Sequence, residues 1–265
     1  MAGRYYVQSL ARGLLILETI ANSPRGLSLT ELVAALRLPK ATAFAFLQTL
    51  ELLGYLERNP ETKVYAPGLK VLDLGFAYLS GRAILDIAQP YLRALSEECR
   101  ATTDVSVLDG GQIMTLALEK VWRMVDYHTN VGSRLPVHGS ASGKALLINH
   151  TTPELAALLG PEPYAMHGPK TITSLAELVG ELEWTRRRGY ALADEELAPG
   201  LRSAAAPIRD REGRIVAAIC VSAPTAIVSH EHLEQVLAPT VVCAAGKISA
   251  ARTVDSGLYR LSGEE

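Results

Sequence analysis

The chain has 265 residues, 48% of them hydrophobic and 20% charged, with a formal net charge of −2 at pH 7. These values are typical of a soluble globular protein that is long enough to form two domains. The sequence has no apolar run that would span a membrane and no signal-peptide core near its start, so we expect a cytoplasmic protein.

The cysteine and histidine patterns do not indicate a metal site. Cys99, Cys220 and Cys243 are too far apart for a CxxC motif and too few for a disulfide framework, so we expect three buried free thiols. His128 and His138 lack a third ligand at useful spacing and are predicted to be hydrogen-bonded structural residues. The sequence therefore predicts no metal and no cofactor.

Three helices are predicted at the start of the chain. The first covers residues 9–21, and the second covers residues 29–36, where Ser28 and Glu31 have the spacing of a capping box. Pro39 suits the first turn of the third helix. The apolar face of the third helix consists of Ala43, Phe46, Leu47, Leu50 and Leu53.

The second and third helices are joined by about four residues, the geometry of a helix-turn-helix that enters the major groove of DNA. An ordinary helical hairpin would show the same pattern. The β-prone segments 55–58 and 63–65 favour the first interpretation, because a turn-prone sequence joins them into a wing. Residues 1–67 are therefore predicted to be a winged helix-turn-helix domain. Residues 1–80 contain eight Lys and Arg against six Asp and Glu, a mild basic balance that suits DNA.

A further apolar stripe runs over residues 69–79, and Ser80-Gly81-Arg82 ends it. Leu69, Leu72 and Phe76 fall on one side of the expected helix. We predict a linker helix within residues 68–82, with this stripe exposed and available for pairing two chains.

Helices, strands and tight turns alternate through residues 83–252. Helices are predicted at 84–99, 144–149, 153–159, 175–188 and 231–250, and strands at 103–108, 112–118, 121–128, 190–193, 204–209 and 215–222. Asp109-Gly110-Gly111 indicates a hairpin. The pattern predicts an α+β domain, a curved antiparallel sheet with packed helices, followed by a tail over residues 253–265.

The loop over residues 131–143 runs into GSASGK, which superficially resembles a phosphate-binding loop. Its glycines are too close together, and an alanine replaces the residue that would hold magnesium. The segment is not a nucleophile elbow either, because Ala141 occupies the central position of Gly-x-x-x-Gly, where the nucleophile would be. The alternative function is a small-molecule-transforming enzyme with a DNA-binding-like regulatory appendage. Ser140 or Ser142 would be its nucleophile and His138 its base, although no carboxylate is positioned by the sequence to orient that histidine.

The chain resembles the IclR family of bacterial transcriptional regulators over nearly its full length. The resemblance rests on four segments in order, SLARGLLILETIA (9–21), LTELVAALRLPKATAFAFLQTLELLGYLE (29–57), VGSRLPVHGSASGKALL (131–147) and RRGYALADEELAPGLRSAAAPIRDREGRIVAAICVSAP (187–224). It implies a winged-helix head, a linker helix and a GAF-like effector domain, with dimers through the heads and often tetramers. The implied function is a regulator, not an enzyme, that binds a double-stranded DNA operator and senses a small organic acid or related metabolite.

The recognition helix departs from the family pattern at Phe44 and Ala45, where the family usually has a polar or basic pair. No arginine remains on the face that would meet the bases. The predicted DNA-binding residues are Lys40, Thr42, Phe44, Gln48, Arg58 and Lys63. The three uncharged residues would contact bases, and the three basic ones would hold phosphates, which gives affinity rather than sequence choice.

The resemblance also implies an effector pocket where the loop over residues 135–143 meets the start of a helix. Successive backbone N–H groups there favour an anion or a carbonyl oxygen. Position by position, the implied pocket residues are Met124, Tyr127, Leu135, Ala141, Ser142, Asp194, Leu201 and Ser203. Met124 and Leu135 would also fit an ordinary core, and Asp194 would also fit a structural role as a hydrogen-bond acceptor.

Overall fold

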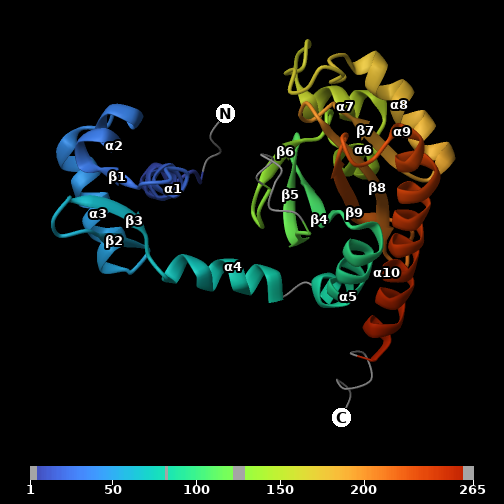
Figure 1. Ribbon diagram of the computed structural model, residues 1–265. Helices are drawn as coiled ribbons and strands as arrows, with labels where there is room; N and C mark the ends of the chain where they lie inside the picture. Colours follow the sequence, from blue (N-terminus) through green and yellow to red (C-terminus); the bar gives the residue numbers. More distant parts are fainter. Residues whose placement is uncertain (1–4, 81–82, 122–128, 259–265) are drawn as a thin grey trace. The chain divides into compact units, whose positions relative to one another are not determined.

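The computed structural model describes residues 5–80, 83–121 and 129–258. Contacts between residues divide the chain into two compact units, residues 1–81 and residues 82–265. We call them the head and the body, and each is described by itself (Figure 1). Within the described residues, no helix is both long and apolar enough to cross a membrane.

The head combines helices with a small antiparallel sheet. Its first helices are α1 (Gln8–Ala21), α2 (Leu29–Leu36) and α3 (Lys40–Leu52). Its strands β1 (Leu27–Ser28), β2 (Leu56–Arg58) and β3 (Val64–Pro67) pair in the order β1-β3-β2. The predicted winged helix-turn-helix is confirmed. Strand β1 was not predicted, because two residues are too few to show a periodic pattern.

The capping box predicted at the start of α2 is present. Ser28 Oγ accepts a hydrogen bond from the Glu31 amide at 3.3 Å, and Glu31 Oε2 accepts one from the Ser28 amide at 2.8 Å. α2 ends where Arg37 takes a left-handed conformation with φ of 51°, and Pro39 directly precedes the first residue of α3. Arg37 in its left-handed conformation ends α2, and Pro39 starts α3, so these two residues define the turn between the helices.

The head has its own hydrophobic core, to which the three helices and the wing all contribute. The buried residues are Ile16, Ile20, Leu32, Ala43, Leu47, Leu56 and Tyr65. Phe46 and Leu50 are partly buried against this core. Leu53, which was predicted to be buried, is 48% exposed, because α3 ends at Leu52 and the chain turns at Gly54, where φ is 80°.

The predicted linker helix is α4 (Lys70–Ser80), which follows the wing. Leu72 and Phe76 on this helix are 52% and 61% exposed, and Leu69 just before it is 75% exposed. Leu74 is also 60% exposed, so apolar surface extends beyond the predicted stripe. Among the described residues, these side chains have no apolar cover within the head.

The body is built on a six-stranded antiparallel sheet with the order β6-β5-β4-β9-β8-β7. The strands are β4 (Thr102–Asp109), β5 (Gln112–Glu119), β6 (Arg134–Pro136), β7 (Ala191–Asp194), β8 (Leu201–Arg209) and β9 (Ile215–Pro224). The helices are α5 (Ala83–Cys99), α6 (Ala141–Leu147), α7 (Thr152–Leu159), α8 (Leu175–Arg188), α9 (His230–His232), the π-helical turn η1 (Leu233–Leu237) and α10 (Ala238–Leu258). This confirms the predicted α+β class.

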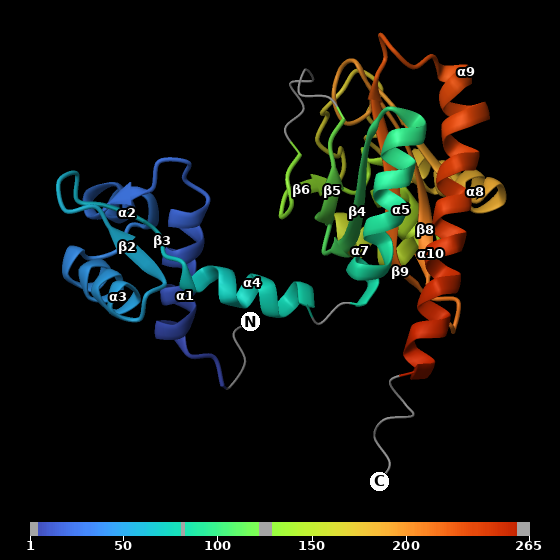
Figure 2. The same cartoon turned by 60° about the horizontal axis from the view of Figure 1, so that its bottom comes forward.

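Helices cover both faces of this sheet, as Figures 1 and 2 show. α5 and α10 pack together on one face, where they contact β4, β8 and β9. α6 packs against β8 and β9 on the other face and is itself packed against α8. Side chains alternate between the two faces along each strand, so every strand contributes to both layers.

Several boundaries in the body differ from the predicted ones. The segment 131–143, predicted to be a loop, contains the edge strand β6 and the first turn of α6, which begins at Ala141 rather than at residue 144. β6 has three residues, too few for an alternating pattern. α10 continues to Leu258, into the predicted tail, and no proline follows Pro239 in this helix. The strand predicted at 121–128 lies outside the described residues apart from Val121, which is a bend.

The three cysteines are free, as predicted, but they are not all buried. Cys220 is buried and Cys99 is partly buried, whereas Cys243 is exposed. Cys243 lies on the outward side of α10, because the neighbouring Val241 and Ala244 take the buried positions of that helix. The expectation of three buried thiols is therefore wrong for one of them.

Candidate functional site

The outer face of α3 carries the residues predicted to meet DNA bases. Phe44 is 45% exposed, Gln48 is exposed and Thr42 is half-buried. Ala43 and Leu47, on the opposite side of the helix, lie in the head core. The helix therefore presents the predicted base-facing set to solvent, and contact with DNA stays a prediction.

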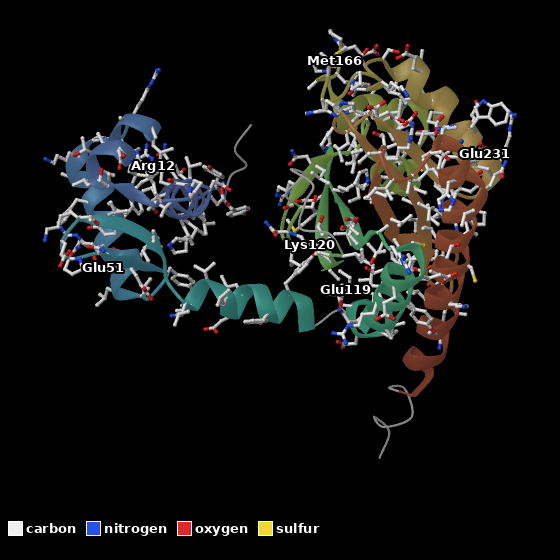
Figure 3. The ribbon with its side chains drawn as sticks, viewed as in Figure 1. Arg12, Glu51, Glu119, Lys120, Met166 and Glu231 are labelled. Carbon is white, nitrogen blue, oxygen red and sulfur yellow. The ribbon has the colours of Figure 1, made fainter. Side chains whose placement is uncertain are left out.

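A carboxylate lies beside this face of α3. Gln48 Nε2 donates to Glu51 Oε2 at 3.1 Å, and Figure 3 labels Glu51 on the head. Thr49 Oγ1 donates to the Ala45 carbonyl oxygen at 2.8 Å. The amide of Gln48 would have to leave Glu51 in order to pair with a base.

The basic residues predicted to hold phosphates are all exposed. Lys40 is the first residue of α3. The Arg58 guanidinium lies 5.6 Å from the centre of the Tyr65 ring. Lys63 has a positive φ of 59° at the wing turn, and its Nζ donates to the Pro60 carbonyl oxygen. Exposed cations of this kind suit contacts with the phosphate backbone.

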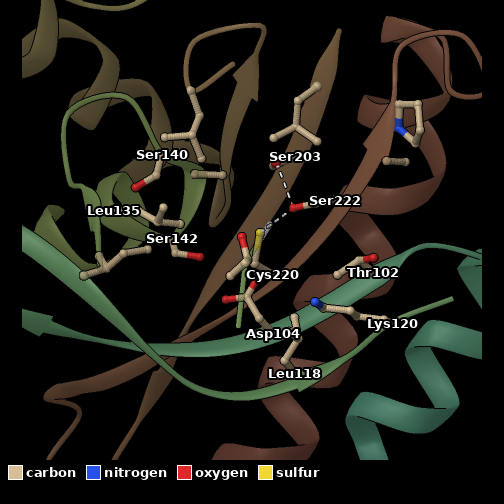
Figure 4. Close-up of a pocket in the computed structure, with 17 residues that line it drawn as sticks. Thr102, Asp104, Leu118, Lys120, Leu135, Ser140, Ser142, Ser203, Cys220 and Ser222 are labelled. Carbon is tan, nitrogen blue, oxygen red and sulfur yellow. Dashed lines mark hydrogen bonds between the residues drawn. The ribbon is translucent and has the colours of Figure 1, made fainter. Parts of the chain in front are cut away.

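The body contains a cavity of about 290 Å³ beside the start of α6 (Figure 4). Its apolar walls include Ile113, Leu118, Leu135, Leu197 and Leu201. The polar side chains that line it are Thr102, Asp104, Lys120, Thr129, Ser140, Ser142, Ser203, Cys220 and Ser222. This volume is at the lower end of the range for small-molecule sites, which is roughly 300–1,000 Å³.

The register of the sheet explains why the strand residues face this cavity. Asp104 of β4 lies opposite Cys220 of β9, and Ser203 of β8 lies opposite Ser222 of β9. Opposed residues share a face, and Cys220 and Ser222 are two positions apart, so all four side chains point to the side that α6 covers. The hydroxyls of Ser203 and Ser222 are 2.9 Å apart, and Cys220 Sγ is 3.6 Å from Ser222 Oγ.

The structure brings most of the implied pocket residues together. Those that line the cavity are Leu135, Ala141, Ser142, Leu201 and Ser203. Met124 and Tyr127, like His128, lie outside the described residues. Binding of a ligand by any of these side chains stays a prediction.

Asp194 does not line the cavity, which corrects the expectation that it would lie close to the ligand. In β7, Ala193 pairs with Ser203 and Asp194 pairs with Arg202, so Asp194 points to the face opposite Ser203. Arg202 Nε and Lys170 Nζ each lie 2.6 Å from its carboxylate. Partial burial acts to raise the pKa of Asp194, but the bonds and charges of these two cations outweigh it and lower the pKa. Asp194 is therefore a paired structural acceptor.

The floor of the cavity contains a buried carboxyl that was not among the predicted site residues. Asp104 is 9% exposed, and Ser106 Oγ donates to its Oδ2 at 2.7 Å. Burial raises the pKa of Asp104 to about 6, against the opposing effect of hydrogen bonds from Ser106 and Cys220. The same burial raises the pKa of the Cys220 thiol, which stays protonated. The sequence indicates this residue by an acid within the β-prone run TTDVSV. Burying a charge is energetically costly, so an acid in a buried strand points to a specific role.

The lysine of the GSASGK motif is structural. Lys144 is fully buried, and its Nζ lies 2.7 and 2.8 Å from the two carboxylate oxygens of Glu196. Burial raises the pKa of Glu196, and the charge of Lys144 only partly offsets this effect. The ion pair joins α6 to the loop that carries Leu197 of the cavity wall. An ammonium group held in this way is not free to bind a nucleotide phosphate.

His138 and Ser140, a base and a nucleophile in the enzyme alternative, bond to backbone groups elsewhere. His138 Nε2 lies 2.9 Å from the Ala165 carbonyl oxygen, and burial lowers the pKa of its ring. Ser140 Oγ donates to the Pro136 carbonyl oxygen at 2.8 Å and accepts from the Gly143 amide at 3.1 Å. The prediction of a hydrogen-bonded structural role for His138 is confirmed, and a Ser–His pair is disfavoured.

Two family signatures match this chain, and named relatives are similar to it over most of its length. The IclR helix-turn-helix domain matches residues 9–60, and the domain described as bacterial transcriptional regulator IclR C-terminal matches residues 76–250. The HTH-type transcriptional regulator XynR of Escherichia coli is 34% identical over 228 residues, which cover 86% of this chain and 90% of XynR. The transcriptional repressor IclR of Escherichia coli is 33% identical over 247 residues, which cover 92% of this chain and 90% of that repressor.

Solved structures match this chain over both the head and the body. A transcriptional regulator from Rhodococcus sp. RHA1 has a TM-score of 0.80 and 36% identity, with 92% of this chain and 98% of that one covered. An IclR homologue from Microbacterium hydrocarbonoxydans, solved as a complex with 4-hydroxybenzoate, has a TM-score of 0.79 and 25% identity, with 92% of this chain and 99% of that one covered.

Proposed function

We propose that this chain, which belongs to the IclR family of bacterial transcriptional regulators, binds its operator through two paired heads and changes that binding when a small organic molecule occupies the body. Regulation of transcription through a DNA-binding head follows from the family. The ligand response is supported by one observation, the cavity of about 290 Å³ inside the domain that matches the family's C-terminal signature.

The outer face of α3 and the wing are the surfaces proposed to bind DNA. Thr42 and the ring of Phe44 would contact thymine methyl groups in the major groove. Gln48 would pair with adenine after releasing Glu51, which lies 3.1 Å away in the free head. The three exposed basic side chains described above would hold phosphates and fix the position of the helix.

Pairing of two heads is supported by exposed apolar side chains. Leu10 and Leu14 of α1 are 63% and 51% exposed, and Phe76 of α4 is 61% exposed. Exposed large apolar side chains that lie together, such as Leu10 and Leu14 one turn apart on α1, mark protein interfaces. Two paired heads would present two recognition helices about 34 Å apart, or a multiple of that spacing, as one face of DNA requires.

The cavity fits a small organic acid or a related metabolite. Leucine and isoleucine side chains would hold an apolar body, and the hydroxyls of Ser142 and Ser203 would orient polar groups. The homologue from Microbacterium hydrocarbonoxydans was solved with 4-hydroxybenzoate, which is a small organic acid. We therefore take benzoate derivatives as the first class of ligand to test.

The proposed mechanism is a population shift. A ligand changes operator affinity only to the extent that it binds one arrangement of the body better than another. Coupling energies of about 1–3 kcal/mol, or roughly 5- to 150-fold in affinity, are typical of such systems. In the sequence, α4 connects the body to the head, and the change would pass through this helix.

Filling the cavity tests the proposal. Ser142 is 3% exposed and lines the cavity, so Ser142→Trp would place an indole ring inside it. We expect this variant to lose the thermal stabilisation that ligands give the wild type, and to keep its affinity for DNA without ligand. Ala176→Trp, on the exposed side of α8, adds the same ring elsewhere and should respond like the wild type. If Ser142→Trp melts cooperatively and ligands still raise its melting temperature as much as they do in the wild type, the ligand binds outside this cavity.

A further inference from the structure

Among the described residues that line this cavity, Asp104 is the acidic one. The residue lies on β4, and Figure 4 shows its carboxyl directed toward the space bounded by Ser142 and Cys220. Ser106 Oγ donates to Oδ2 at 2.7 Å, which leaves lone pairs of the carboxylate on the cavity side. This carboxyl therefore sets the electrostatic character of the floor.

In the part of the chain that the structure describes, no cation pairs with Asp104. The partners that the described residues offer its carboxyl are Ser106 and Cys220, and neither is a cation. Lys120 also lines the cavity, but it is exposed and its Nζ donates to Asn130 Oδ1 at 3.0 Å. A ligand carboxylate placed against Asp104 would be repelled or would have to share a proton, whereas a hydroxyl or amino group would donate a hydrogen bond.

The other polar groups of the floor do not impose this choice. Ser203 and Ser222 bond to each other at 2.9 Å, and either hydroxyl can donate or accept. Ser142 has the same freedom. An ionised carboxylate can only accept, so Asp104 decides which kind of group the floor binds.

We propose that Asp104 determines the ligand specificity of this cavity, and that the ligand directs a hydroxyl or amino group at Asp104 while its apolar body packs against Ile113, Leu118 and Leu135. The inference rests on the proposed function and names the end of the ligand that the floor recognises. Where the ligand also has a carboxylate, that group lies away from Asp104.

Four benzoates that differ at a single position test this inference. 4-Hydroxybenzoate and 4-aminobenzoate carry a hydrogen-bond donor at that position, terephthalate carries a carboxylate, and benzoate carries hydrogen. Their dissociation constants are measured by calorimetry on the full chain and on Asp104→Asn, which keeps the size of the side chain and an oxygen for Ser106. Ser222→Ala is the matched control, since it removes a floor hydroxyl and leaves the carboxyl in place.

We expect the wild type to bind both donor-bearing compounds at least about tenfold more tightly than benzoate, and terephthalate most weakly. Hydrogen bonds to a charged group are stronger than neutral ones, so Asp104→Asn should reduce this preference about tenfold. Its affinity for benzoate should stay within about twofold, and Ser222→Ala should keep the preference. If Asp104→Asn does not melt cooperatively, Asp104→Ala serves as a second variant that lacks the carboxylate.

Equal binding of benzoate and 4-hydroxybenzoate by the wild type, or an undiminished preference in both Asp104 variants, would overturn the inference and leave the cavity as the ligand site. Failure of all four compounds to bind the wild type at millimolar concentration would also overturn it. The Ser142→Trp comparison, made with ligands found by an unbiased screen, then decides the proposed function separately.

Discussion

Two aspartates in the same sheet have opposite environments. Asp104 faces the cavity, its hydrogen-bond partners among the described residues are Ser106 and Cys220, and burial raises its pKa to about 6. Asp194 lies between Arg202 and Lys170, which lower its pKa in spite of partial burial. The two carboxyls therefore affect the free energy of unfolding with opposite dependence on pH.

We expect Asp104 to lower the stability of the fold as the pH rises. Its pKa is about 6 in the folded chain against an ordinary value of 3.8, so the folded state holds the proton more tightly than the unfolded state. Relative to Asp104→Asn, the wild type is most stable below pH 4 and loses on the order of 3 kcal/mol between about pH 4 and pH 6. Urea unfolding of both proteins across this range measures the difference, in which effects of Glu196 and other carboxyls cancel. If the difference in free energy of unfolding between the two proteins did not change with pH, ionisation of Asp104 would not destabilise the folded state.

The buried ion pair of Lys144 and Glu196 gives a second prediction. Lys144→Met removes the cation and leaves the carboxyl of Glu196 buried, which should cost about 3–5 kcal/mol in the free energy of unfolding. The double variant Lys144→Met/Glu196→Gln removes both charges and should recover most of that loss. Chemical denaturation measures all three proteins. If the free energy of unfolding of Lys144→Met were within about 1 kcal/mol of the wild-type value, the assignment of a buried ion pair would be contradicted.

At the scale of the element, α3 and the wing are proposed to divide the work of DNA binding. The outer face of α3 has no arginine, so phosphate contacts should carry a large share of the affinity. The wing supplies two of these cations, Arg58 and Lys63, beside the short strands of the head sheet.

Substitutions in the two elements should therefore have different effects. Lys63→Ala should weaken specific and non-specific binding alike and reduce the slope of log affinity against log salt by about one unit. Gln48→Ala should relax discrimination at one base position, at a cost of about 1–3 kcal/mol there. Binding titrations at several salt concentrations, on the operator and on single-base variants of it, separate the two. An unchanged salt slope for Lys63→Ala would mean that the wing does not contact the backbone.

The elements that could be predicted from the sequence are those with a local signal. Ser28 and Glu31 marked the start of α2, because a capping box depends only on residues three apart. Strand β6 was missed because its pairing with β5 is a long-range contact. The cavity was predicted as a region, but Asp194 was placed there wrongly and Asp104 was overlooked. Which face a strand residue takes depends on register, and a shift of one position reverses it.

At the scale of the whole molecule, pairing of two chains is the proposed step on which operator binding would depend. A single head has one recognition helix, whereas one face of DNA with two half-sites needs two. Leu10, Leu14 and the apolar side chains of α4 are exposed, and we propose that they provide the surface for this pairing.

Charges introduced on α1 should separate the two chains. Leu10→Lys with Leu14→Lys should give a monomer in sedimentation at micromolar concentration, with an unchanged melting temperature of the body. The same variant should lose operator binding, and footprints of the wild type should show a pseudo-palindrome with half-sites about 10 bp apart or at a larger helical repeat. A wild-type chain that is itself monomeric, with no preference for any DNA sequence, would refute pairing through the heads.

Coupling between the cavity and the operator is tested most directly by one titration. Operator DNA recovered by selection from genomic fragments is titrated with the wild type and with Ser142→Trp, with and without a saturating ligand. We expect the ligand to change the dissociation constant of the wild type by at least about fivefold and that of Ser142→Trp not at all. A wild-type dissociation constant that is the same with and without bound ligand would contradict a ligand-responsive regulator.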